Sequence, residues 1–212
     1  CRSWENVVIG KLRFDAGIRP DSVKVVFVDT IQKFDKLLAL LYSQKEVAID
    51  TETTSLFRVA NTMLTIQFAF DKKKAFFLPY KHYDTPFSAQ ELGYIKEKLS
   101  EYFLTNNNSL HLYCNANFDI PIIRKEFELP IYQNTIWDVQ AGEYVIDENH
   151  VELANVTGSG YYNLGNLSLQ YGFDGYLSGK FGKEDRVGIG KIPLDTPGLL
   201  NYGGYDVVIL HG

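Results

Sequence analysis

An apolar run that ends in two acidic residues is the feature that most constrains this chain. Residues 47–49 are apolar, Asp50-Thr51-Glu52 follows them, and the sequence then turns polar. Side chains at positions i and i+2 share one face of a β-strand, so a strand here would project Asp50 and Glu52 together from the end of a buried element. Two carboxylates on one face repel each other unless a cation lies between them, and a divalent metal is the expected cation. Surface strands also carry such pairs, so this motif depends on support from the rest of the chain.

A second apolar segment, residues 110–114, also leads into polar residues. Asn115 precedes Asp119 by four positions, and the apolar residues after Asp119 have helical spacing. We therefore predict a strand followed by a helix that carries Asp119 at its N-terminus. The alternative is that Asn117 or Asp119 only caps this helix.

A third segment pairs a tyrosine with an acid. Tyr202 and Asp206 are four residues apart and would share one face of a helix, and residues 207–210 form an apolar tail. Gly203 and Gly204 lie between them, although each glycine costs a helix roughly 1 kcal/mol relative to alanine. The pair indicates either a loosened turn or close approach by another backbone. The alternative interpretation is a core tyrosine followed by an exposed aspartate.

In this order, the three segments closely resemble the motifs of the 3′–5′ exonuclease domain of family A DNA polymerases. The matching motifs are Asp50-x-Glu52, Asn115-x-x-x-Asp119 and Tyr202-x-x-x-Asp206. The segment from Trp137-Asp138 to Tyr144 is similar to the helix that the family has between its second and third motifs. Each motif is weak alone, and the ordered set carries the resemblance.

The resemblance identifies the chain as a tyrosine-type (DEDDy) member, because Asn201 stands where the sister group has histidine. It covers about residues 22–212, which we take as one exonuclease domain after an N-terminal extension of residues 1–21. It implies an α/β, ribonuclease-H-like fold, in which a mixed sheet is flanked by helices.

The resemblance also implies the chemistry. Two divalent ions, Mg²⁺ or Mn²⁺, would be held by Asp50, Glu52, Asp119 and Asp206. Asp50 would bridge both ions, and Asp119 would hold the second through water. Tyr202 would orient the attacking water. Four further residues match positions near the terminal nucleotides: Thr53, Leu56, Asn115 and Phe118.

Hydrophobic periodicity predicts an order of elements that fits this fold. Predicted strands are 23–28, 47–50, 64–70, 74–79 and 110–114. Predicted helices are 31–41, 88–104, 137–146, 164–171 and one that starts near Pro197. Ser88 followed by Glu91 three residues later predicts a capping box at the start of helix 88–104. The strands from 47 to 79 would form a meander, and strand 110–114 follows a helix, which predicts a parallel crossover back to strand 47–50.

Composition limits the setting of the protein. The chain has 212 residues, 45% of them hydrophobic and 22% charged, and no apolar run approaches the length of a membrane span. Cys1 and Cys114 are its only cysteines, so a disulfide framework is excluded and a reducing cytoplasm fits. The chain begins with cysteine and ends inside a predicted helix, so we expect a fragment of a longer protein. Its divergent loops also fit a virus-encoded protein, for example from a phage.

The resemblance implies a proofreading role. The substrate would be the 3′ end of single-stranded or mismatched DNA, and the partner a polymerase domain in the same longer chain, with no membrane involved. A net charge of −5 argues mildly against a free-standing binder of duplex DNA. One alternative is a ribonuclease-D-like enzyme that trims RNA. The other is a nucleic-acid-binding scaffold without activity, for which loss of an acid would be the sign.

Overall fold

The computed structural model describes residues 23–55, 61–146, 162–170 and 189–211. The predicted extension, residues 1–21, and the predicted substrate residue Leu56 lie outside these ranges. Within them, the strands are β1 (Lys24–Phe27), β2 (Glu46–Thr53), β3 (Met63–Ala69), β4 (Lys74–Pro79), β5 (Leu110–Tyr113) and β6 (Thr135–Asp138). The α-helices are α2 (Ile31–Ser43), α3 (Ala89–Thr105), α4 (Ala116–Glu126), α5 (Val139–Ile146), α7 (Leu164–Gln170) and α9 (Leu199–Val208). Two 3₁₀ turns are η4 (Ile189–Lys191) and η5 (Ile209–His211).

The six strands form one mixed sheet in the order β1-β4-β3-β2-β5-β6. Strands β2, β3 and β4 pair antiparallel, whereas β1 with β4, β2 with β5 and β5 with β6 pair parallel. The predicted meander and the predicted parallel crossover beside β2 are both confirmed, and with them the α/β class and the ribonuclease-H-like arrangement. None of the described helices is long and apolar enough to cross a membrane.

One prediction is wrong, since residues 135–138 form a strand, and the helix that was expected to begin at Trp137 begins at Val139. Ile136 and Trp137 are β-branched and aromatic, which favours a strand, and Trp137 pairs with Leu112 of β5. The helix starts after Asp138 because its carboxylate Oδ1 accepts a hydrogen bond from the backbone N–H of Gln140 at 3.0 Å.

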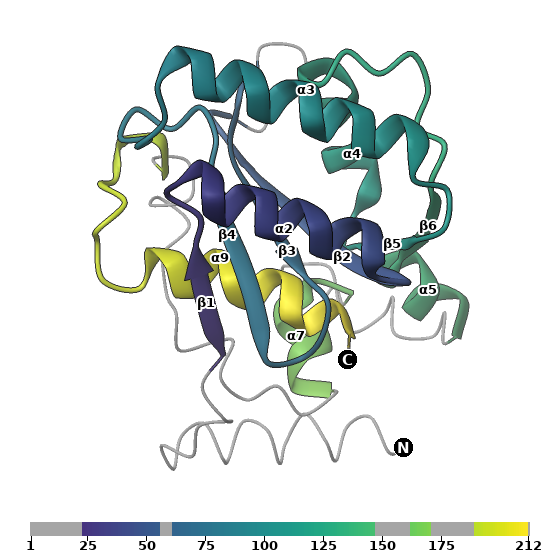
Figure 1. The fold of residues 1–212 in the computed structure, drawn as a ribbon. Coiled ribbons are helices and arrows are strands. Elements are labelled where there is room, and N and C mark those ends of the chain that lie inside the picture. The colour runs from purple at the N-terminus through teal and green to yellow at the C-terminus, as the bar shows by residue number, and fades with distance from the viewer. Residues whose placement is uncertain (1–22, 56–60, 147–161, 171–188, 212) are drawn as a thin grey trace.

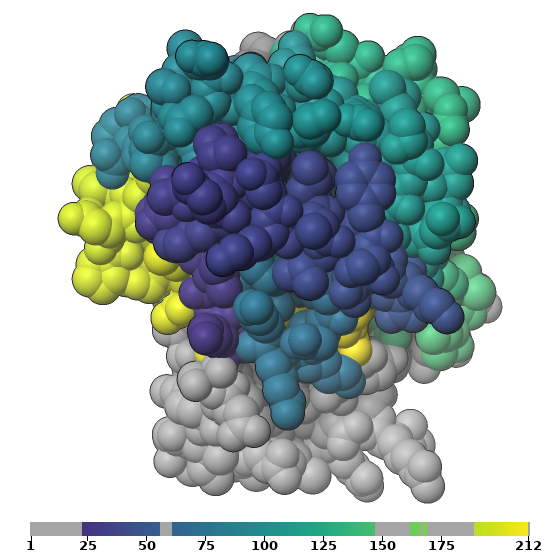
Figure 2. Space-filling model, viewed as in Figure 1, coloured from purple at the N-terminus to yellow at the C-terminus, as the bar shows by residue number. Residues whose placement is uncertain are grey.

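Large apolar side chains fill the face of the sheet that is covered by α2, α3 and α4. The buried residues of this face include Phe34, Leu37 and Leu41 of α2, Leu99 and Phe103 of α3, Ile123 of α4, and Ile49, Ile66 and Phe68 of the sheet. Helices α2 and α3 lie on the opposite side of the sheet from α9 (Figure 1). They lie next to each other on the surface turned to the viewer in Figure 2. The predicted capping box of α3 is present, with Ser88 and Glu91 each bonding the other's backbone N–H.

On the opposite face of the sheet, small residues line part of the surface that α9 crosses. Ala48, Ala69 and Ala75 pack with Val207 and Val208 of α9. Because alanine extends only one carbon from the backbone, the α9 helix lies close to the strands. This face carries the candidate site.

Candidate functional site

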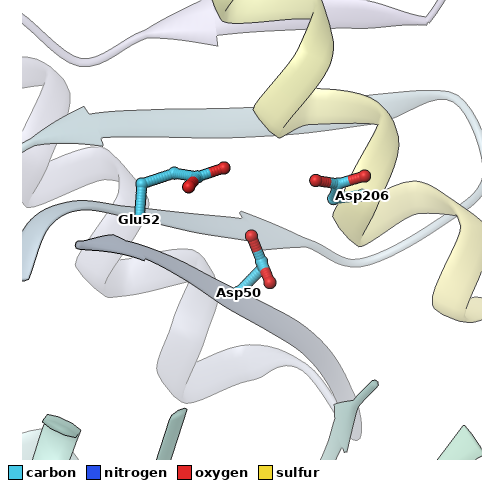
Figure 3. Close-up of side chains that lie close together, drawn as sticks. All are labelled: Asp50, Glu52 and Asp206. Atoms are coloured by element: carbon cyan, nitrogen blue, oxygen red, sulfur yellow. The ribbon is translucent and has the colours of Figure 1, made fainter. Parts of the chain in front are cut away.

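Three of the four predicted acids come together between β2 and α9. Carboxylate oxygens of Asp50, Glu52 and Asp206 lie within 4.8 Å of one another. Asp50 and Glu52 project from β2, and Asp206 projects from α9 into the same space (Figure 3). The strand period of two explains this arrangement, because Ala48 packs against α9 and the next residues on its face are Asp50 and Glu52. The predicted projection of both strand acids from one face is confirmed.

Two glycines let α9 bring Asp206 to the strand. A Cβ atom at Gly204 would lie 2.5 Å from Cγ2 of Val25, and one at Gly203 would lie 2.9 Å from Nε2 of Gln67. Both distances are too short for a real Cβ contact, so a side chain here would displace the helix or its neighbours. The glycine pair therefore permits close approach, as one of the two explanations expected, but the approaching groups are side chains of the sheet and not another backbone.

Asp119 lies beside this cluster and is held separately. Its side chain is buried, and its Oδ1 accepts two hydrogen bonds from Thr51, one from the backbone N–H at 3.1 Å and one from Oγ1 at 2.6 Å. Asn115 is the N-cap residue of α4, and its side chain makes no capping hydrogen bond. Asp119 is bound to β2, so the alternative that it only caps α4 is not what the structure shows.

The cap of α4 comes instead from Asp138, which was not among the predicted site residues. Its Oδ2 accepts from the backbone N–H of Ala116 at 2.8 Å, and its Oδ1 accepts from that of Asn115 at 3.1 Å. One carboxylate at the end of β6 thus holds the start of α4 as well as the start of α5. Asn115 has φ 67° and ψ 55° in the left-handed region, and its side chain is exposed. The sequence signal that could have identified Asp138 is its position, because it is an acidic residue at the junction of a strand and a helix.

The electrostatics of the site favour a bound cation. The pKa of Asp50 is raised well above its usual value, mainly by burial and then by Asp119, Asp206 and Glu52. Burial also raises the pKa of Asp119 to about 7, although the hydrogen bonds from Thr51 oppose the rise. Carboxylates that disfavour one another's charge become compatible when a divalent ion neutralises them. An all-oxygen donor set suits hard ions such as Mg²⁺ and Mn²⁺, so the residues present fit such an ion.

The remaining predicted residues surround the acids in different environments. Tyr202 is half-buried and packs against a small apolar cluster that includes Leu199 and Ile189. Thr53 is buried at the end of β2, and its Oγ1 donates to the carbonyl of Ser55 at 3.0 Å. Phe118 is half-buried against the main core. The roles predicted for these residues and for Asn115 stay predictions.

Comparison with known proteins places the chain in a family. Residues 25–172, more than half of the chain, match the sequence family described as 3′–5′ exonuclease. A search of curated protein sequences found no match.

Several solved structures share this fold at low sequence identity. A mutant form of the catalytic core of RRP6 from Trypanosoma brucei has 18% identity and a TM-score of 0.56, and the match covers 88% of this chain but only 44% of that one. RNase D from Trypanosoma brucei, in complex with RNA U12, has 13% identity and a TM-score of 0.58 over 90% of this chain and 62% of that one. NrnC from Brucella melitensis with bound Mg²⁺ has 13% identity and a TM-score of 0.52 over 90% and 77%. At these identities the likeness shows the fold alone.

Proposed function

The chain belongs to the 3′–5′ exonuclease family, and from this premise we propose that it removes nucleotides from the 3′ ends of single-stranded or mismatched DNA. We further propose that residues 22–212 form the proofreading domain of a longer DNA polymerase. The observation that carries the proposal is the convergence of Asp50, Glu52 and Asp206 beside the buried Asp119. The preference for DNA and the polymerase partner rest on the order of the three sequence motifs.

The four acids would hold two divalent ions. When bound, Mg²⁺ or Mn²⁺ would supply the positive charge that activates a water and stabilises the leaving oxygen in phosphodiester hydrolysis. Asp50, Glu52 and Asp206 offer the clustered oxygens for the first ion. Asp119, bound to Thr51 beside the cluster, would serve the second.

The other site residues would orient water and substrate. Tyr202 lies one turn before Asp206 on α9, where its hydroxyl would accept or donate one hydrogen bond to the attacking water. Asn115 has an exposed side chain, because Asp138 replaces it as the cap of α4, and this supports contact with the terminal nucleotide. Phe118 would stack on a base. Thr53 and Leu56 would be further contacts for the terminal nucleotides, although Leu56 lies outside the described residues.

The second candidate function is 3′ trimming of RNA. It is favoured by one observation, that the structures sharing this fold include an RNase D in complex with RNA. The same four acids would serve both reactions, so the site alone does not discriminate between the two substrates. An inactive scaffold is disfavoured because all four acids are present.

A comparison of four labelled substrates tests the proposal. The protein would be incubated with Mg²⁺ and one of four substrates: single-stranded DNA, duplex DNA with a mismatched 3′ end, the same duplex with a matched end, or single-stranded RNA of the same sequence. We expect the first two to be degraded faster than the matched duplex, because paired terminal nucleotides must leave the stack at a cost of a few kcal/mol. Asp206→Asn is the control for contaminating nucleases.

Each outcome decides between the candidates. Faster degradation of RNA than of DNA would replace the proofreading proposal by RNA trimming. Equal rates on matched and mismatched ends, or release of nucleotides from the 5′ end, would overturn the editing role. Activity that persists in Asp206→Asn would show that the acids are not the site.

A further inference from the structure

Thr51 stands between the two strand acids but faces away from them. Asp50 and Glu52 project toward α9 (Figure 3), whereas the Thr51 hydroxyl donates to Asp119 of α4. Thr51 is 5% exposed, and its hydroxyl and backbone N–H both donate to the same oxygen, Oδ1 of Asp119. The hydroxyl contact, at 2.6 Å, is the shorter of the two.

The sheet is open at this point, which is why the backbone of Thr51 is available. The parallel pairing of β2 with β5 ends at Ala48 and Leu112, and α4 begins shortly after β5. Beyond Ala48, β2 has no partner residue on β5, and the N–H of Thr51 bonds the carboxylate of α4. Asp119 therefore replaces a strand neighbour at the place where the two strands diverge.

We propose that Thr51 is a positioning residue for Asp119, which it fixes through Oδ1 so that Oδ2 is presented to the second metal ion. A carboxylate torsion has a broad, two-fold energy profile, so an unrestrained Asp119 could rotate between orientations. Two donors on one oxygen select a single orientation. The inference rests on the proposed function, since it assigns Thr51 to one of the two proposed ions.

The test is direct binding of Mn²⁺ to the whole chain, measured by isothermal titration calorimetry and by electron paramagnetic resonance. Thr51→Val keeps the size of the side chain and the backbone N–H but removes the hydroxyl donor. We expect binding of the second Mn²⁺ to weaken by about 10–100-fold, the range typical of partners that orient a ligand. Binding of the first Mn²⁺, at the cluster of Asp50, Glu52 and Asp206, should change little.

Two further variants separate positioning from a general structural effect. Thr51→Ser restores the hydroxyl and should restore the second Mn²⁺ to within a few-fold of the wild-type affinity. Thr85 lies after β4, and its Oγ1 donates an equally short hydrogen bond, at 2.6 Å, to the carbonyl of Pro79. Thr85→Val removes that bond and should leave the binding of both ions unaffected. Thermal unfolding of each variant would be recorded in parallel.

The results that overturn the inference differ from those that overturn the proposed function. The role of Thr51 would be refuted if Thr51→Val bound both ions with wild-type affinity or lost affinity for both ions equally. It would also be refuted if Thr51→Ser did not recover the second ion, or if the wild-type protein bound only one ion. A protein that binds two Mn²⁺ ions in the expected manner but releases no nucleotide from DNA or RNA would refute the proposed function alone. A protein that binds no Mn²⁺ would refute both.

Discussion

The two faces of the sheet differ in the size of the side chains that pack on them. The face under α2, α3 and α4 is filled by bulky side chains such as Phe68 and Phe103. The face under α9 is lined by Ala48 and Ala75, and the helix meets it through two glycines, of which Gly204 makes the closest approach. The first arrangement maximises buried apolar area, whereas the second minimises the distance between helix and strand. The difference shows that one face stabilises the fold and the other brings side chains from distant parts of the chain together.

This division has an energetic consequence for α9. Full burial of a large apolar side chain contributes about 1.5–3 kcal/mol, and most of the largest fully buried side chains lie on the α2–α3–α4 face. The α9 face buries smaller apolar groups and also carries the carboxylates of Asp50, Glu52 and Asp206, which repel one another without a cation. We therefore expect a bound divalent ion to strengthen the attachment of α9 to β2.

The largest expected effect comes from removing the charges on β2. Asp50→Asn with Glu52→Gln should reduce nuclease activity by far more than the roughly 10–100-fold typical of partners that only orient a ligand. The fold should persist, because the main core lies on the other face and loses no contact. Activity on labelled single-stranded DNA and circular dichroism together measure this. Wild-type activity in the double variant would refute the assignment of the site.

The same variant should be more stable than the wild type when no metal is present. The pKa of Asp50 is raised in the folded state, so its ionisation opposes folding, and stability falls as the pH rises from the unfolded pKa toward the folded one. Asparagine removes this loss at neutral pH. Thermal unfolding measures both effects. With a chelator, the variant should have a higher melting temperature than the wild type. When Mn²⁺ is added, the melting temperature of the variant should rise by less than that of the wild type.

A smaller loss of activity is expected from Tyr202→Phe, which sharpens the comparison within α9. Phenylalanine keeps the packing of this half-buried ring against Leu199 and removes only the hydroxyl. If the hydroxyl positions the attacking water, the rate should fall by about 10²-fold or more. Single-turnover cleavage across a Mn²⁺ titration is the measurement. An unchanged rate, or a defect that more metal fully corrects, would make Tyr202 the core residue of the alternative interpretation.

Two substitutions test whether the contact between Gly204 and Val25 sets the distance between α9 and the sheet. Gly204→Ala places a methyl group against Val25, and overpacking of this kind costs about 1–3 kcal/mol of stability. The displaced helix should also carry Asp206 away from β2 and weaken Mn²⁺ binding. Val25→Ala removes the opposing methyl groups, so the double variant should recover both properties relative to Gly204→Ala. Absence of recovery would show that this contact does not set the position of the helix.

The sequence predicted the bulky face of the sheet more completely than the α9 face. Apolar periodicity located β3 and β4 within one residue, and Ser88 with Glu91 marked the start of α3, because these signals are local. The acids were identified by order and spacing. Their arrangement into three clustered carboxylates and a separate Asp119 depends on where β2 and β5 diverge, which no local pattern encodes.

The role of Asp138 also depends on a long-range arrangement that no local sequence pattern encodes. Its neighbours Ile136 and Trp137 favour a strand, but a resemblance to a helix of the family directed the prediction elsewhere. Its role in holding α4 depends on the pairing of β6 with β5, which brings a residue at the end of one strand to the start of a helix 22 positions earlier in the chain.

The smallest expected effect serves as the matched control for the glycine of α9. Gly93 lies on the exposed surface of α3, the helix that covers the bulky face, and a Cβ added there would meet nothing within 4 Å. Gly93→Ala should therefore stabilise the protein by about 0.5–1 kcal/mol, since alanine loses less backbone freedom in a helix than glycine. Mn²⁺ binding and nuclease activity should stay at wild-type levels. The same substitution would thus have opposite signs at the exposed glycine of α3 and at the packed glycine of α9. A destabilising Gly93→Ala, measured by urea unfolding, would contradict this difference.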